Sequence, residues 1–218
     1  MERDDFEKII QLLQNQTRRK ILEILSREGH YPLQISRSMN TSQQAISKHL
    51  KRLEEQGLVT SRESKSRKGG PPTKTYTLNR EFSVRIDLGP QLFKTKIEEL
   101  DDLDDLEGFD DLKDKFDQEL ENKTLEKQRK LVQEIEEEIE DLENKRKCLL
   151  KMKEKALSEA FNFIHEEFDD YEVREILYYV LDSGVKDPDK IARQFNVRED
   201  EIERIINKIK KINKIDIW

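Results

Sequence analysis

The sequence has little of what one large apolar core requires. Hydrophobic residues make up 34% of its 218 residues and aromatic residues 7%, whereas charged residues make up 41%. We therefore expect small helical domains joined by solvated helices. No run of about 18 apolar residues occurs, which argues against a membrane span, and the polar residues 1–5 lack the apolar stretch of a signal peptide. These absences predict a cytoplasmic protein.

Cysteine is nearly absent as well. The single Cys148 can form neither an internal disulfide nor a cysteine-based zinc site. His30, His49 and His165 are far apart in the sequence, so we expect no metal site. No glycine-rich phosphate loop, nucleophile elbow or metal-ligand cluster occurs, and the acidic pairs within residues 101–105 resemble a solvated helix face more than catalytic carboxylates. The sequence therefore predicts a protein that is not an enzyme and needs no cofactor.

Charge is present in abundance but is unevenly distributed. The formal net charge is −7, yet residues 1–96 carry 19 basic and 11 acidic side chains, a net of +8. Residues 97–143 carry 6 basic and 21 acidic side chains, a net of −15, and residues 144–218 carry 16 of each. This asymmetry predicts a basic N-terminal module that meets a polyanion and an acidic remainder that does not.

The N-terminal part combines helical and strand patterns. Apolar spacing, caps and turn residues predict helices over residues 6–13, from Thr17 to Gly29, from Pro32, and over residues 43–56, followed by Gly57. Two strands, 58–63 and 73–78, flank a basic tip, and a further strand is expected over 82–88 before Gly89 and Pro90. Helices whose last pair forms a helix-turn-helix, followed by a hairpin, indicate a winged helix-turn-helix.

A long helical arm is expected next. Residues 122–165 contain no proline or glycine, and apolar residues recur in steps of four and three, which is typical of a coiled coil. The seam contains the predicted dimerisation residues Val132, Ile135, Ile139, Leu142 and Leu149, and the polar Gln128 and Arg146 interrupt it. The resulting domain prediction is a winged helix-turn-helix over 1–96, an acidic linker over 97–121, a coiled-coil dimerisation arm over 122–165 and a C-terminal helix-turn-helix-like domain over 166–218. The fold class is mainly α.

An internal repeat supports the C-terminal assignment. Residues 21–22 correspond to 176–177. After one inserted residue, residues 35–40 align with 191–196, and Ile46, Leu50 and Leu53 match Ile202, Ile206 and Ile209. Only residues 212–218 follow the repeat, which is too short for a wing. We expect a wingless helix-turn-helix-like unit.

The exposed faces of the two units differ in chemistry. Short polar and basic side chains can reach base edges and phosphates in a groove of double-stranded DNA. The predicted DNA-binding residues of the first unit and its wing tip are Ser42, Gln43, Gln44, Ser47, Lys48, Lys51, Lys65, Arg67 and Lys68. The matching positions of the second unit hold Glu199, Asp200 and Glu203, which phosphates would repel. We expect that unit to pack against its dimer mate, to dock another protein or to cap the arm.

Two groups of motifs resemble a known family. The stretches NQTRRKILEIL, TSQQAISKHLKRLEEQGLV and KGGPPTKTYTL resemble winged-helix regulators of the archaeal ArsR family, with the heat-shock and sulfur-response regulators nearest in plan. SVRIDLGPQLF is similar to the former, and the terminal REILYYVLDSGVKDPDKIARQFNVREDEI to the latter. The resemblance implies a homodimer that binds promoter DNA at an inverted-repeat operator and controls transcription, as a repressor. It does not extend to a disulfide switch or a cysteine metal site, because residues 27–32 contain no cysteine.

Two other functions fit the same residues. A chromatin or transcription-machinery component without sequence specificity would share the fold and the basic face. A protein-interaction adaptor would use the acidic arm and lack DNA affinity. Gln43 and Gln44 favour a sequence-specific regulator, because a glutamine amide can bond to adenine at two points.

Overall fold

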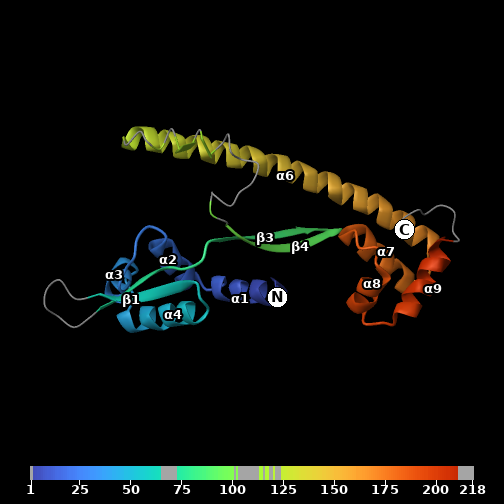
Figure 1. Ribbon diagram of the computed structural model, residues 1–218, viewed down its shortest axis with the longest axis horizontal. Helices are drawn as coiled ribbons and strands as arrows, with labels where there is room; N and C mark the ends of the chain where they lie inside the picture. The colour runs from blue at the N-terminus through green and yellow to red at the C-terminus, as the bar shows by residue number, and fades with distance from the viewer. Residues whose placement is uncertain are drawn as a thin grey trace. The chain divides into compact units, whose positions relative to one another are not determined.

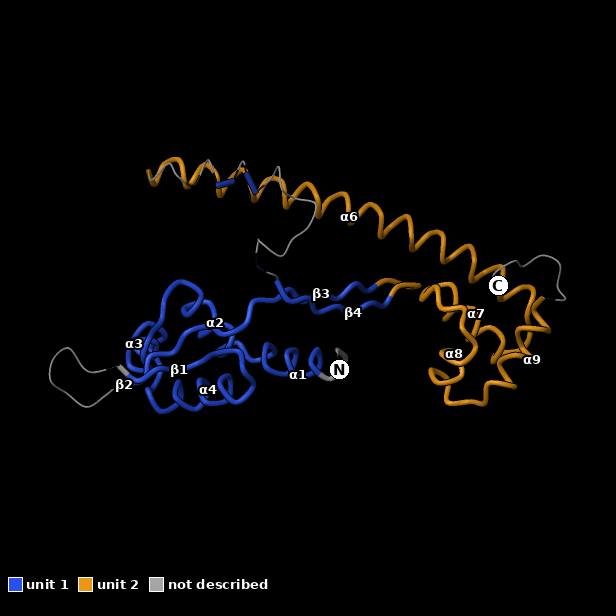
Figure 2. The backbone as a smooth tube through the Cα atoms, in the orientation of Figure 1, with its two compact units in different colours: residues 1–88, 93–117 blue, residues 89–92, 118–218 orange. Residues whose placement is uncertain are grey.

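The computed structural model describes residues 2–64, 73–100, 102, 113, 114, 116, 117, 120 and 124–210. It divides into two compact units, one of residues 1–88 and 93–117 and the other of residues 89–92 and 118–218 (Figure 2). The elements of the first unit are α1 (Glu2–Leu13), α2 (Gln16–Leu25), α3 (Pro32–Ser38), α4 (Gln43–Glu55), β1 (Val59–Ser64), β2 (Thr73–Leu78), β3 (Phe82–Gly89) and β4 (Leu92–Glu99) (Figure 1). They are followed by α6 (Leu125–Glu167), α7 (Tyr171–Ser183), α8 (Pro188–Phe195) and α9 (Glu199–Lys210). The predicted, mainly helical fold class is confirmed.

The junction of α1 and α2 is closed by polar side chains. The Asn15 carboxamide oxygen accepts a hydrogen bond from the Arg18 backbone N–H at 3.1 Å, so α2 begins at Gln16 rather than after Thr17 as predicted. Arg18 Nη2 donates to the Gln11 carbonyl at 2.9 Å, and Arg19 donates to the Leu13 carbonyl. Two basic residues therefore satisfy carbonyl groups at the end of α1 that have no partner within the helix.

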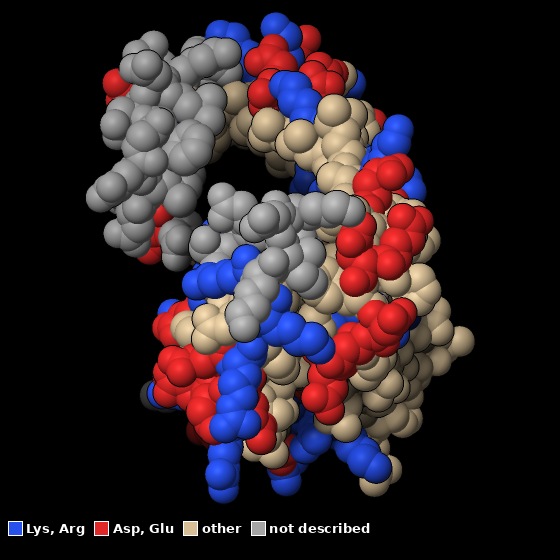
Figure 3. Space-filling model, turned by 90° about the vertical axis from the view of Figure 1, so that its right-hand side faces the viewer, with Lys and Arg blue, Asp and Glu red and all other residues tan. Residues whose placement is uncertain are grey.

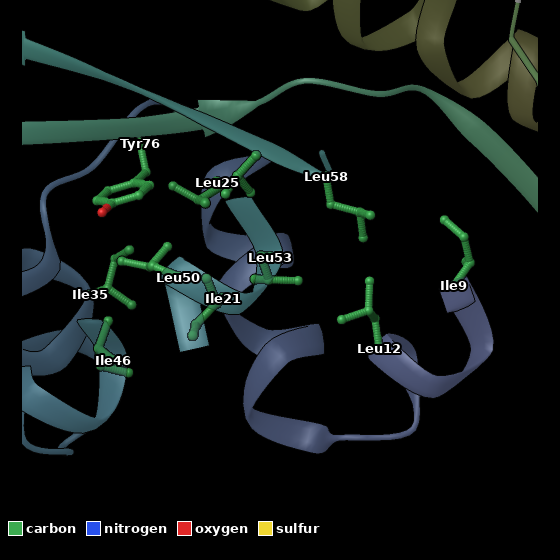
Figure 4. Close-up of a cluster of buried hydrophobic side chains, with 11 residues drawn as sticks. Ile9, Leu12, Ile21, Leu25, Ile35, Ile46, Leu50, Leu53, Leu58 and Tyr76 are labelled. Atoms are coloured by element: carbon green, nitrogen blue, oxygen red, sulfur yellow. The ribbon is translucent and has the colours of Figure 1, made fainter. Parts of the chain in front are cut away.

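The helix-turn-helix is formed by α3, α4 and the turn between them. Asn40 takes a left-handed conformation with φ of 49°, and the Thr41 N–H donates to the Ser36 carbonyl at 2.9 Å, which fixes the turn. Beneath it lies a cluster of buried side chains from the helices and the strands (Figure 4). Its members are Ile9, Leu12, Ile21, Leu25, Ile35, Ile46, Leu50, Leu53, Leu58, Val59 and Tyr76. Since α4 contributes three of them, its opposite face is left to solvent.

The wing hairpin pairs β1 with β2 in antiparallel register, from Val59 opposite Leu78 to Ser64 opposite Thr73. Gly57 ends α4 with φ of 73°, a conformation that favours glycine and turns the chain into β1. His30 and Tyr76 exchange both backbone hydrogen bonds, at 3.1 and 2.8 Å. This bridge ties the segment between α2 and α3 to β2, so the wing strands are anchored on the helix-turn-helix.

A second hairpin was only half predicted. The strand expected over 82–88 is β3, but the residues Gly89 and Pro90 lead into a second strand, β4, rather than ending the sheet. Phe82, Val84 and Ile97 pack against the core of the first unit. β4 therefore occupies the first residues of the segment expected to be an acidic linker.

Arg80 ties α1 to both ends of this hairpin. Its guanidinium bonds to both carboxylate oxygens of Asp5, with Nη2 to Oδ2 at 2.9 Å, and also pairs with Glu99. The hydrogen bond from Arg80 holds the pKa of Asp5 below its ordinary value despite partial burial. Contacts between residues 75 positions apart in sequence thus complete the first unit.

The second unit is built on the C-terminal end of α6. Ile164 and Phe168 pack with Val173, Leu177 and Ile209 in one buried cluster. A neighbouring cluster joins Ile176, Val180, Ile191, Ala192, Ile202 and Ile206. The 43-residue helix α6 confirms the long helix predicted over residues 122–165.

The helix-turn-helix repeat is present in the backbone. Asn196, the counterpart of Asn40, is also left-handed, with φ of 54°, and no other non-glycine residue in the described ranges has positive φ. The Val197 N–H donates to the Ala192 carbonyl at 3.0 Å, which repeats the bond at the first turn. The counterparts Ile202, Ile206 and Ile209 are buried, as predicted. The C-terminal unit is therefore a second helix-turn-helix-like fold.

Charged side chains of both signs lie on the surface. On the face drawn in Figure 3, acidic and basic side chains both lie among uncharged ones. Within the described residues, no helix is both long and apolar enough to cross a membrane.

Candidate nucleic-acid interface

The exposed side of α4 carries most of the predicted DNA-binding residues. Gln43, Gln44, Lys48 and Lys51 are exposed and Ser47 is half-buried. Side chains three and four positions apart share one face of a helix, so Gln44, Ser47, Lys48 and Lys51 form a continuous polar strip. Its chemistry is one that base edges and phosphates can accept.

The start of α4 is set by its cap. The Ser42 hydroxyl accepts a hydrogen bond from the Ala45 N–H at 3.2 Å, so this oxygen is already used in holding the helix N-terminus. Ser42 is exposed next to Gln43, and the first turn of α4 contains no acidic residue. A helix N-terminus carries partial positive charge, which favours a nearby phosphate.

Positive charge on this face comes from its lysines. Lys51 Nζ lies 4.0 Å from Glu55 Oε1, an exposed pair that water screens, whereas no ion pair within the described residues involves Lys48. Burial lowers the pKa of His49, and the charges of Arg18 and Lys48 lower it further. His49 is therefore uncharged near neutral pH and adds no positive charge to the helix.

A groove beside the helix-turn-helix was not foreseen. It has a volume of about 500 Å³ and is lined by Gln16, Thr17, Lys20, Glu23, Ile24, Arg27, Ser38, Met39, Asn40 and Thr41. The basic run of Arg18, Arg19 and Lys20 was the sequence feature that could have indicated this groove. The structure separates its members, because Arg18 and Arg19 close α1 whereas Lys20 lines the groove.

Three predicted DNA-binding residues, Lys65, Arg67 and Lys68, lie outside the described residues. Within the described ranges, no group of three or more histidine, cysteine or acidic side chains could hold a metal ion.

Comparisons with known proteins address the same region. Residues 13–62 match the family described as a helix-turn-helix domain. Solved structures similar to the chain include reduced HlyU from Vibrio cholerae N16961, at 28% identity and a TM-score of 0.31, and HlyU from the same organism, at 29% identity and a TM-score of 0.30. Each comparison covers 35% of this chain, and it covers 74% and 76% of those chains respectively. No curated protein matches.

The matched segment covers α2, α3, α4 and most of β1. A helix-turn-helix places its second helix against DNA, which supports a DNA-binding transcription regulator. Such a domain is a binding module rather than a catalytic one. The exposed strip of α4 lies on that second helix.

The corresponding face of α9 has the opposite charge. Glu199, Asp200 and Glu203 are all exposed at the positions that match Gln43, Gln44 and Ser47. Arg204, which matches Lys48, pairs with Asp200 at 3.2 Å within the same helix. One fold therefore presents a neutral to basic face in the first unit and an acidic face in the second.

The predicted dimerisation seam on α6 is exposed to solvent. Its side chains retain large exposed fractions: 64% for Val132, 40% for Ile135, 49% for Ile139, 55% for Leu142 and 65% for Leu149. Exposed apolar residues in a coiled-coil pattern indicate an interface. By contrast, Leu157 and Ile164 farther along the helix are buried.

Proposed function

We propose that this protein is a sequence-specific transcription repressor of the archaeal ArsR type. Two copies bind an inverted-repeat operator in double-stranded promoter DNA, and each inserts α4 into a major groove. The observation that carries this proposal is the exposed face of α4, where Gln43, Gln44 and Lys48 stand on the second helix of a helix-turn-helix. Such a regulator acts in the cytoplasm, on chromosomal DNA.

Dimerisation through α6 supplies the second half of the site. Val132, Ile135, Ile139, Leu142 and Leu149 would be covered by α6 of a second copy, which removes their apolar surface from water. A symmetric dimer matches a symmetric operator, because each half-site is read by one copy. Lys65, Arg67 and Lys68 would contact the DNA backbone from the wing tip.

The C-terminal unit has another use in this proposal. Glu199, Asp200 and Glu203 would be repelled by phosphates, so α9 packs against the dimer mate or docks another protein instead of reading DNA.

Sequence specificity is tested by selecting bound sequences from random DNA and footprinting the protein on the most enriched sequence. An inverted repeat protected at nanomolar protein supports the proposal. Equal affinity for all sequences would indicate a general chromatin component instead, and no mobility shift at moderate salt would indicate an adaptor.

Replacing Gln43 and Gln44 with alanine is expected to relax sequence choice. Each lost base contact costs about 1–3 kcal/mol on the operator, whereas binding to random DNA changes little. The ratio of the two dissociation constants, measured by titration at one salt concentration, gives the effect. Equal losses on both DNAs would contradict a base-reading role.

Replacing Lys48 with alanine is expected to act differently. A lost phosphate contact weakens binding to operator and random DNA alike and lowers the slope of log affinity against log salt by about one. Arg52→Ala is a matched control on the same helix, because Arg52 already pairs with Glu55 at 3.8 Å. If the two variants behaved alike, Lys48 would have no special contact.

A further inference from the structure

Charge along α6 is arranged in blocks. Residues 134–143 contain seven acidic side chains and no basic one, whereas residues 145–155 contain six basic side chains and one acidic. Beyond them, residues 127–130 hold three basic side chains, and residues 159–167 hold three acidic ones and no lysine or arginine. The order of charge is therefore basic, acidic, basic, acidic, with its centre near residue 144.

These blocks are poorly neutralised within one copy of α6. Residues 134–142 are all exposed, and no ion pair within the described residues involves Glu136, Glu138, Glu140 or Asp141. Glu136 and Glu140 are four positions apart, a spacing at which like charges destabilise a helix. In the basic block, Arg146 pairs with Glu143 and Lys151 with Glu154 within the helix, and Lys153 pairs with Asp182 of α7 at 2.7 Å. Glu136, Glu138, Glu140 and Asp141 are therefore left to water or to a partner outside this helix.

We propose that two copies of α6 pair antiparallel, about a two-fold axis near residue 144. This inference rests on the homodimer proposed above and adds its orientation. Reversal about residue 144 sets each acidic block against the basic block of the other copy, and residues 127–130 against Glu159. A parallel pair in register would instead set acidic against acidic and basic against basic, which costs energy wherever like charges approach.

The apolar seam fits the same arrangement. Ile139 and Leu149 are equally far from residue 144, so each lies level with the other residue in the second copy. Both are exposed, at 49% and 65%. Leu157 and Ile164, which lie farther from the axis, are already covered by their own unit. The second copy therefore covers the part of α6 that remains exposed within a single chain.

Distances between spin labels on the full-length dimer test the orientation. Cys148 is exposed and is the only cysteine, so it takes the first label; Gln133→Cys with Cys148→Ser takes the second. At a rise of 1.5 Å per residue, antiparallel copies separate positions 133 by about 33 Å along the axis and positions 148 by about 12 Å. Parallel copies would give nearly equal, short distances at both sites. That result would overturn the antiparallel orientation but not the dimer. Sedimentation of a monomer would overturn the dimer itself.

Exchanging charges between the acidic and basic blocks provides a second test. The dimer dissociation constant should change in opposite directions for antiparallel and parallel dimers. Glu136→Lys with Glu140→Lys should raise the dimer dissociation constant about tenfold at low salt, because the attraction between oppositely charged blocks of the two copies is weakened. Adding Lys147→Glu and Lys151→Glu should restore it. In a parallel dimer the first pair of changes would relieve repulsion and tighten the complex. If the acidic segment 101–117 of the same chain neutralised the basic block instead, restoration would fail, which also overturns the proposal.

Discussion

Replacing Ile135 and Ile139 with aspartate should convert the protein into a monomer and weaken operator binding about 100-fold or more, because two linked half-sites become independent. Both side chains are half-exposed in one copy of α6, so their apolar surface is available to a second copy and contributes little to the fold of the single chain. Two new carboxylates would also join a segment that already holds seven. Sedimentation and a mobility shift measure the two effects.

A matched control lies on another face of the same helix. Gln133→Asp with Glu137→Asp places two aspartates at the same spacing, away from the seam, and adds one negative charge where the seam variant adds two. That variant should remain a dimer and bind the operator normally. Circular dichroism should show α6 intact in both variants. If the unmodified protein sedimented as a monomer at micromolar concentration, the seam would have another partner.

Giving α4 the acidic face of α9 should abolish operator binding. Gln43→Glu, Gln44→Asp and Ser47→Glu give α4 the face of α9, with carboxylates where DNA phosphates approach. The loss should exceed about 3 kcal/mol, since base contacts disappear and repulsion is added. The fold should survive, because residues 43 and 44 lie in the first turn of α4, where acidic side chains favour the helix dipole, and residue 47 is half-exposed. Thermal unfolding and operator titration report the two properties separately.

The reciprocal exchange is the control. Glu199→Gln, Asp200→Gln and Glu203→Ser give α9 the chemistry of α4 at exposed positions. Operator affinity of the full protein should stay unchanged or rise without specificity. A fragment of residues 166–218 should give no mobility shift even at low salt. An operator footprint from that fragment would show that the chain carries two DNA readers.

The sequence alone determined the elements whose causes are local. Ser42 and Gly57 set the ends of α4, and the spacing of Ile46, Leu50 and Leu53 set its buried face. The exposed positions of Gln43, Gln44 and Lys48 followed from that spacing. The repeat at Asn40 and Asn196 was also readable, because one core pattern needs one turn conformation. Each of these features depends on residues within a few positions of one another.

Other features were decided only by the tertiary structure. Arg18 and Arg19 contribute to the basic charge of residues 1–96, yet both side chains satisfy carbonyl groups of α1. β4 was not predicted because a two-stranded hairpin is stable only when it packs on something, and here Ile97 packs on the core of the first unit. The bridge from His30 to Tyr76 and the pair of Arg80 with Asp5 join residues far apart in sequence. Such contacts form only when the chain folds, so no local pattern of residues encodes them.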